Sequence, residues 1–135
     1  MNGALLDTSI LIAMASDDET TPDLSGFEAV AISALSWTEL LRGTHSATEL
    51  QHYKDRSFRG EWIHDRFGRG IAFDDACVHA FERIMRHLAA NRREVRSHHL
   101  DRMLAATALA HDLTVVTRDR TGFAGLEGLI DVIEV

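Results

Sequence analysis

Four acidic residues stand where a strand should end or a helix should begin: Asp7, Glu39, Asp101 and Asp119. Asp7 follows the apolar run 4–6, and Asp119 follows the apolar run 113–117. If both runs are parallel strands, the two carboxylates share one edge of the sheet, where open α/β folds place their active sites. Several carboxylates in one place need a divalent cation, a bound Arg or protonation. We therefore interpret the four acids as a metal site.

Each acid also has a purely structural interpretation. The spacing from Ser36 to Glu39 is that of a capping box, in which Glu39 would only bond back to the Ser36 amide. Asp7 and Asp119 suit ordinary N-caps, and Asp101 suits the first turn of a helix because of the helix dipole. For any one acid alone this interpretation is favoured. The four together, two of them directly after expected core strands, favour the metal site.

Length and composition predict one compact domain spanning residues 1–135. The chain is 45% hydrophobic, has one proline, and contains no repeat or low-complexity tract. Its single cysteine, Cys77, falls on the apolar face of an expected helix and is predicted to be a buried thiol. The N-terminus lacks a basic leader region, and no apolar run approaches the roughly 20 residues that span a membrane. We therefore expect no membrane association and a cytoplasmic location.

The basic residues are almost all arginines. Net charge is −7, which by itself argues against a nucleic-acid partner. Of 14 basic residues only Lys54 is a lysine, and many of the arginines lie between Arg83 and Arg102. Arginine favours bidentate contacts with phosphate or carboxylate, which suits RNA or an acidic partner. A solvated helical face explains any one of these arginines equally well.

Apolar periodicity alternates between strands and helices along the whole chain. Strands are expected at 4–6, 29–33, 113–117 and 129–135, and helices at 8–16, from 36 through 41, 47–67, 74–90 and 100–111. A short apolar run occupies 71–73, and loops are expected at 17–26, 91–97 and 122–128. This alternation predicts an α/β fold with a mostly parallel central sheet flanked by helices on both faces.

Four short motifs together resemble those of a known family. They are Asp7-Thr8-Ser9, the run 36–43 with Glu39, the run 100–108 with Asp101, and Val116-Thr117-Arg118-Asp119 with Phe123. In this order and spacing the set resembles the PIN-domain ribonucleases, and most closely the VapC toxins of toxin–antitoxin operons. The resemblance covers essentially the whole chain and implies a single PIN-like domain. It departs from the family pattern at Gly122, where many relatives carry an additional Asp.

The resemblance implies a Mg²⁺- or Mn²⁺-dependent endoribonuclease whose catalytic residues are the four acids. Such ions take hard oxygen ligands, keep several waters and activate water for in-line attack. Asp7 and Asp101 are the expected direct ligands, Glu39 a ligand or water-positioning group, and Asp119 a ligand on the side of a second ion. The hydroxyls of Ser9 and Thr117 would support these carboxylates, although turn and strand chemistry explains both about as well.

Substrate and partners also follow from the resemblance. It implies cleavage of structured RNA, in tRNA or rRNA loops, to 5′-phosphate and 3′-hydroxyl ends, and thereby inhibition of translation. It implies a homodimer and a cognate antitoxin that inserts a basic side chain into the acidic pocket. The helices around 10–14 and 37–41 are candidates for the antitoxin groove, although their apolar faces suit the core equally.

Two other classes of protein are alternatives to the ribonuclease. A non-catalytic module with the same fold would use the acidic pocket to hold an Arg of its partner, and the presence of all four acids disfavours it. A phosphoacceptor receiver domain would need paired acids after its first strand and a lysine late in the chain. Lys54 is the sole lysine, which makes the receiver class a poor match.

Overall fold

A parallel sheet forms the centre of the computed structural model, which describes residues 2–17 and 20–135. Its strands in the described chain are β1 (Gly3–Leu6), β2 (Ala29–Ala31), β3 (Thr114–Thr117) and β4 (Val132–Glu134). They lie in the order β2-β1-β3-β4, and every neighbouring pair is parallel. The expected α/β class with a parallel central sheet is confirmed.

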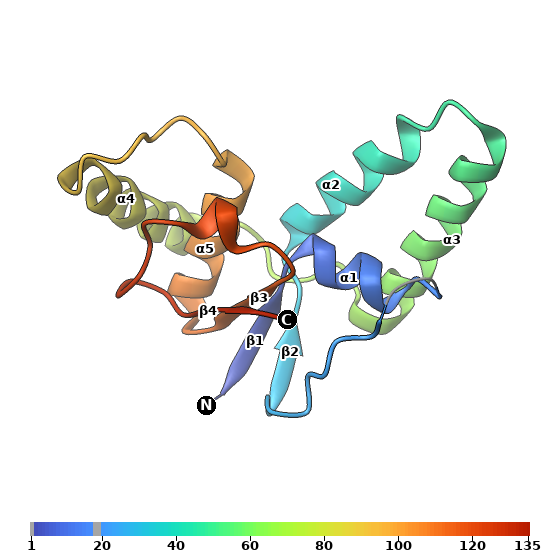
Figure 1. Cartoon of the computed structure of the whole chain (residues 1–135), viewed down its shortest axis with the longest axis horizontal. Coiled ribbons are helices and arrows are strands. Elements are labelled where there is room, and N and C mark those ends of the chain that lie inside the picture. The colour runs from blue at the N-terminus through green and yellow to red at the C-terminus, as the bar shows by residue number, and fades with distance from the viewer. Residues whose placement is uncertain (1, 18–19) are drawn as a thin grey trace.

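Helices cover both faces of this sheet, with α1, α2 and α3 on one side and α4 and α5 on the other (Figure 1). Their bounds are α1 (Thr8–Met14), α2 (Ala34–His45), α3 (Leu50–Phe67), α4 (Asp75–Ala90) and α5 (His99–His111), and a 3₁₀ turn, η1 (Arg120–Phe123), follows β3. Among the described residues no helix is both long enough and apolar enough to cross a bilayer.

Two apolar cores result from the alternation of side chains along the strands. Leu5 and Val115 point into the core formed with α4 and α5. Leu6 and Val116, each one residue further on, point into the core formed with α1, α2 and α3. Successive residues of a strand face opposite sides of the sheet, so strands buried on both faces must be apolar throughout. This requirement explains the apolar residues of β1 before Asp7 and the two adjacent valines, Val115 and Val116, in β3.

The carboxyl ends of β1 and β3 meet at one edge of the sheet. Leu6 pairs with Val116 in the parallel register, and the Asp7 amide donates to the Val116 carbonyl at 2.9 Å. Asp7 therefore leaves the sheet beside Thr117, at the edge where α1 and α2 begin (Figure 1). The sheet edge predicted from the two apolar runs is the one observed.

The alternative interpretation of Ser36 and Glu39 as a capping box is wrong. Helix α2 starts two residues earlier, because Ser33 is its N-cap and its Oγ accepts the Leu35 amide at 3.0 Å. Ser36 lies inside the helix with its hydroxyl buried and without a hydrogen-bond partner. Glu39 is thus free of a capping role.

Smaller differences concern the ends of elements. The run 71–73 forms a single bridge from Ile71 to Ser33 rather than a strand, and the closing strand is confined to Val132–Glu134. Part of the expected loop at 122–128 belongs to η1. Asp74 caps α4 as predicted, and Cys77 is a buried free thiol. In the acidic loop at 17–26, Asp18 and Glu19 lie outside the described residues.

Candidate active site

Asp7 is held by three hydrogen bonds at the end of β1. Its Oδ1 accepts the Thr8 amide at 2.8 Å, as an N-cap does. Its Oδ2 accepts the hydroxyl of Thr117 at 2.7 Å and that of Ser9 at 3.1 Å. An ionised carboxylate offers about four lone-pair sites, so a ligand position remains open. The structure therefore brings both predicted supporting hydroxyls onto Asp7 and fixes the orientation of its carboxylate.

Glu39 is connected to the surroundings of Asp7 through Thr8, which lies 31 residues earlier in the sequence. The Thr8 hydroxyl donates to Glu39 Oε1 at 2.9 Å, and Thr8 itself is buried at the start of α1. Burial raises the pKa of Glu39, and the negative charge of Asp7 adds to the rise, against the Thr8 hydrogen bond and the charge of Arg42. Glu39 thus lies within electrostatic reach of Asp7, on the first half of α2.

Asp101 extends from the first turn of α5 and packs against Gly122 of η1. A Cβ atom added at Gly122 would lie 2.6 Å from Asp101 Cγ and 2.9 Å from Asp101 Cβ. No side chain fits there unless Asp101 moves. Gly122, where the sequence departs from the family pattern, therefore allows η1 to pack directly against the Asp101 carboxylate because it has no side chain.

The pKa of Asp101 shows that the acids act on one another. Burial first, and then the charges of Asp7, Glu39 and Asp119, together raise it from an ordinary value of 3.8 to about 6. His98 opposes this effect, with Nδ1 at 4.0 Å from Asp101 Oδ2. Among the described residues no other ion pair involves any of the four acids. Their negative charge is therefore left largely uncompensated by the protein.

Asp119 lies at the exposed rim of the group. Its Oδ1 accepts the Thr121 amide at 3.0 Å, and hydrogen bonding by the side chain of Thr121 and by this amide holds the pKa of Asp119 below its usual value. Its own amide donates to Thr117 Oγ1 at 3.1 Å, so the same threonine contacts both Asp7 and the backbone of Asp119. Asp119 thus combines a capping role with a place beside the other acids.

A divalent cation fits the chemistry of this donor set. Within the described chain no group of three or more His, Cys, Asp or Glu side chains is placed to hold a metal ion without further ligands. Mg²⁺ does not need one, because it is usually bound through one or two carboxylates and keeps several waters. Such an ion would complement the hard oxygen donors and the raised pKa of Glu39 and Asp101, because among the described residues no Arg or Lys forms an ion pair with any of the four acids.

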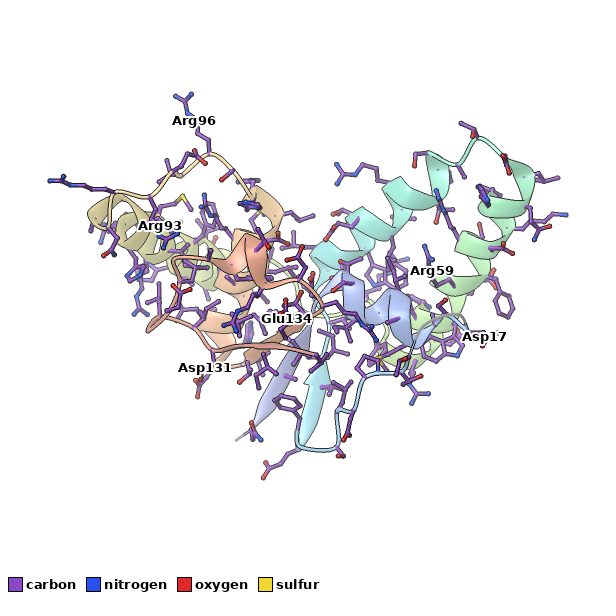
Figure 2. All side chains as sticks on the ribbon, in the orientation of Figure 1. Asp17, Arg59, Arg93, Arg96, Asp131 and Glu134 are labelled. Atoms are coloured by element: carbon purple, nitrogen blue, oxygen red, sulfur yellow. The ribbon has the colours of Figure 1, made fainter. Side chains whose placement is uncertain are left out.

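Reasoning from sequence did not identify Thr8 or Glu134. Thr8 connects Asp7 to Glu39, and only the packing of α1 against α2 reveals the contact. Glu134 pairs with Thr117 in the sheet register, and its Oε1 accepts the Arg120 amide at 3.0 Å (Figure 2). The sequence signal for Glu134 was its place at the end of the closing strand, which parallel pairing brings to the same edge.

Known proteins that resemble this chain in sequence and in fold are PIN-domain proteins and members of toxin–antitoxin systems. The PIN domain family profile covers residues 4–128. The chain is 30% identical to Ribonuclease VapC1 of Rickettsia felis over 128 aligned residues. The aligned region spans 94% of this chain and 92% of that protein. The crystal structure of VapBC-5 from Mycobacterium tuberculosis, a member of the VapBC family of toxin–antitoxin systems, superposes with a TM-score of 0.78, 29% identity and full coverage of both chains. FitAcB from Neisseria gonorrhoeae has a TM-score of 0.77 and 25% identity, over 97% of this chain and 96% of that chain.

Proposed function

The chain belongs to the PIN-domain family, in its VapC branch, and from this premise we propose that it is a divalent-metal-dependent endoribonuclease and the toxin of a toxin–antitoxin pair. One observation carries the proposal. The charges of Asp7, Glu39 and Asp119 all act on Asp101 near the carboxyl edge of the parallel sheet and, after burial, help to raise its pKa to about 6. The similarity to Ribonuclease VapC1 supports the reaction class.

In this proposal Asp7 and Asp101 hold a Mg²⁺ or Mn²⁺ ion, Glu39 is a further ligand or positions water, and Asp119 lies toward a second ion. When bound, such ions supply Lewis-acid activation of water and of the phosphodiester. The protein contributes orientation. Ser9 and Thr117 fix the Asp7 carboxylate, and Thr8 fixes Glu39. Supporting hydrogen bonds of this kind typically change metal affinity or activity by about 10- to 100-fold.

The proposed reaction is hydrolysis of an RNA phosphodiester. Water attacks phosphorus in line, the bond from phosphorus to the 3′ oxygen breaks, and the leaving oxygen takes up a proton. The products are a 5′-phosphate and a 3′-hydroxyl. We propose structured RNA, in tRNA or rRNA loops, as the substrate, with inhibition of translation in the cytoplasm as the result.

A cognate antitoxin and a homodimer complete the proposal. Structural relatives such as VapBC-5 are described as members of toxin–antitoxin systems, which supports a protein partner for this chain. The uncompensated carboxylates suit a partner's Arg, whose planar fork can bind two oxygens at once. Such an Arg would compete with the divalent ion for the same acids.

The test is cleavage of total bacterial RNA by the purified, antitoxin-free chain with Mg²⁺ or Mn²⁺, followed by mapping of the cut ends. We expect discrete fragments with 5′-phosphates, which EDTA and the variants Asp7→Asn and Asp101→Asn abolish. Asp131→Asn is the matched control, because it makes the same change at an exposed residue outside the four acids (Figure 2). A folded, metal-supplied wild type that cuts neither tRNA nor rRNA would favour the non-catalytic binding module instead.

A further inference from the structure

A basic hollow of about 530 Å³ lies beside the four acids. The loop that connects α4 to α5, the first turns of α5, and η1 with the residue after it form its walls. The residues that carry the argument are Arg92, Arg93, Glu94, His98, Arg102 and Thr121. Figure 2 shows that Arg96, from the same loop, extends away from the fold. Three arginines against one glutamate make this hollow positive, although the whole chain carries a net charge of −7.

Arg102 is the unusual residue in the hollow. It is only 4% exposed, and in the part of the chain that the structure describes its Nε and Nη1 have no hydrogen-bond partner. A buried cation without a partner is costly, and native proteins rarely retain one unless a ligand or counter-charge completes it. The sequence interpretation of these arginines as a solvated helical face is wrong for Arg102. Both unpartnered nitrogens are themselves buried, although Arg102 lines the hollow, so the guanidinium must turn toward the hollow for its fork to bind an anion there.

The carboxylate of Glu94 does not act as the counter-charge of Arg102. Glu94 accepts the amide of Ser97 at 2.7 Å and also that of Arg96, so it closes its own loop. These hydrogen bonds lower the pKa of Glu94 to about 2, with a small contribution from the charge of Arg102. Among the described residues no ion pair joins Glu94 to Arg102.

The hollow and the acids share two residues. His98 faces the hollow, and its Nδ1 lies 4.0 Å from Asp101 Oδ2. Thr121 lines the hollow, and its amide donates to Asp119 Oδ1 at 3.0 Å. Arg93 also lines the hollow. Its side chain packs against Gly125, just after η1, where an added Cβ would lie 2.8 Å from Arg93 Nε. An anion in the hollow would thus be a neighbour of a group bound at the acids.

We infer that this hollow binds a phosphate of the RNA strand next to the scissile phosphate, with Arg102 as its buried anchor. The inference rests on the proposed function and adds a substrate contact to it. An RNA strand that reaches the acids must bring further phosphates past their negative charge. A guanidinium fork matches phosphate geometry in two parallel hydrogen bonds. The adjacency to the acids favours a nucleic-acid strand over an acidic peptide as the source of the anion.

The first arm of the test measures thermal stability against inorganic phosphate, with chloride at equal ionic strength as reference and EDTA present. Phosphate that binds only the folded chain raises Tm with its concentration. We expect this rise in wild type and in Arg83→Met, an exposed α4 variant that loses the same charge. We expect the rise to disappear in Arg102→Met and to shrink in Arg102→Lys, which keeps the charge but loses the fork. Arg93→Met, at an exposed residue, is the second variant that should weaken the rise, so the test stands even if Arg102→Met folds poorly.

The second arm measures binding of a short fluorescent single-stranded RNA in EDTA as salt is varied. Loss of one phosphate contact reduces the slope of log K against log salt by about 0.7 for a single strand. We expect that reduction in Arg102→Met and no change in Arg83→Met. Equal slopes in wild type and all variants, with no effect of Arg102 on the phosphate response, would overturn the inference.

The outcomes separate this inference from the proposed nuclease. Phosphate and RNA binding that depend on Arg102, in a chain that cleaves nothing, would support the hollow and refute the nuclease. Cleavage that persists with an unchanged KM in Arg102→Met, without any phosphate response, would refute the hollow alone. A Tm response to poly-glutamate that needs Arg102, with none to phosphate or RNA, would show an acidic protein partner and overturn the RNA assignment.

Discussion

Removing the charge of Asp101 should stabilise the metal-free protein at neutral pH. The pKa of Asp101 is raised from 3.8 to about 6, so the folded state holds the proton more tightly than the unfolded chain does. The folded state therefore binds more protons between about pH 4 and 6, and stability falls as pH rises through that window. Above pH 6 the full cost of the charged carboxylate is present. Asp101→Asn has no such charge and should escape that cost.

The size of the effect follows from the same values. A tenfold change in proton affinity is worth about 1.4 kcal/mol, so the rise to about 6 corresponds to about 3 kcal/mol at most. The Asp101 side chain is 34% exposed, and solvent screening reduces this to about 1–2 kcal/mol. For a chain of this length 1 kcal/mol moves Tm by about 4 °C. We expect Asp101→Asn to unfold about 4–8 °C above wild type at pH 7.5 in EDTA.

Thermal unfolding followed by circular dichroism from pH 4 to pH 8 measures the difference directly. The gain should shrink toward zero near pH 4, where wild-type Asp101 is protonated. Asp131→Asn, which changes an exposed residue, should follow wild type throughout. Adding Mg²⁺ should raise the Tm of wild type more than that of Asp101→Asn. A variant no more stable than wild type at pH 7.5, or one whose gain is undiminished at pH 4, would refute the electrostatic coupling of the acids.

Three further substitutions test the geometry around the acids. Gly122→Ala should displace Asp101. Because misplacing a catalytic group by about 1 Å can lower the rate by about 100-fold, the kcat of this variant for RNA cleavage should fall by that order while its circular dichroism stays native. An unchanged kcat would show that Asp101 has room to move. Thr117→Val removes the 2.7 Å hydrogen bond to Asp7 and should lower kcat about tenfold, with Thr117→Ser restoring most of it; equal loss in both variants would point to packing instead. Ser33→Ala removes the N-cap of α2 and should cost about 1 kcal/mol in urea unfolding, whereas a shift no larger than for Ser46→Ala would contradict the capping role.

Much of the fold was readable from local pattern. The residues of β1 and the central valines of β3 are apolar because both faces of the sheet are buried, and each strand is followed directly by a charged residue that leaves the sheet. Parallel pairing then places Asp7 beside Thr117 without further information. The edge argument predicted that Asp7 and Asp119 leave the sheet at the same edge, and in the structure Thr117 contacts the Asp7 carboxylate and the Asp119 amide.

Other features depended on tertiary packing. Ser33 and Ser36 both carry N-cap chemistry, and only the chain's path from β2 decides that Ser33 caps α2. The hydrogen bond from Thr8 to Glu39 joins two helices far apart in sequence, so no local pattern encodes it. The burial of Arg102 breaks the rule that charged residues face solvent, and nothing in the local sequence distinguished Arg102 from the neighbouring arginines for which a solvated helical face was an equal alternative.

Titration of Mn²⁺ into the purified chain by isothermal calorimetry tests the central claim most directly, because the proposed activity depends on metal bound by these acids. The account predicts that wild type and Asp131→Asn bind Mn²⁺ alike, and that Asp7→Asn and Asp101→Asn lose most of this affinity while remaining folded. Equal Mn²⁺ binding by all four proteins would contradict it, since the ion would then lie somewhere other than at the sheet edge.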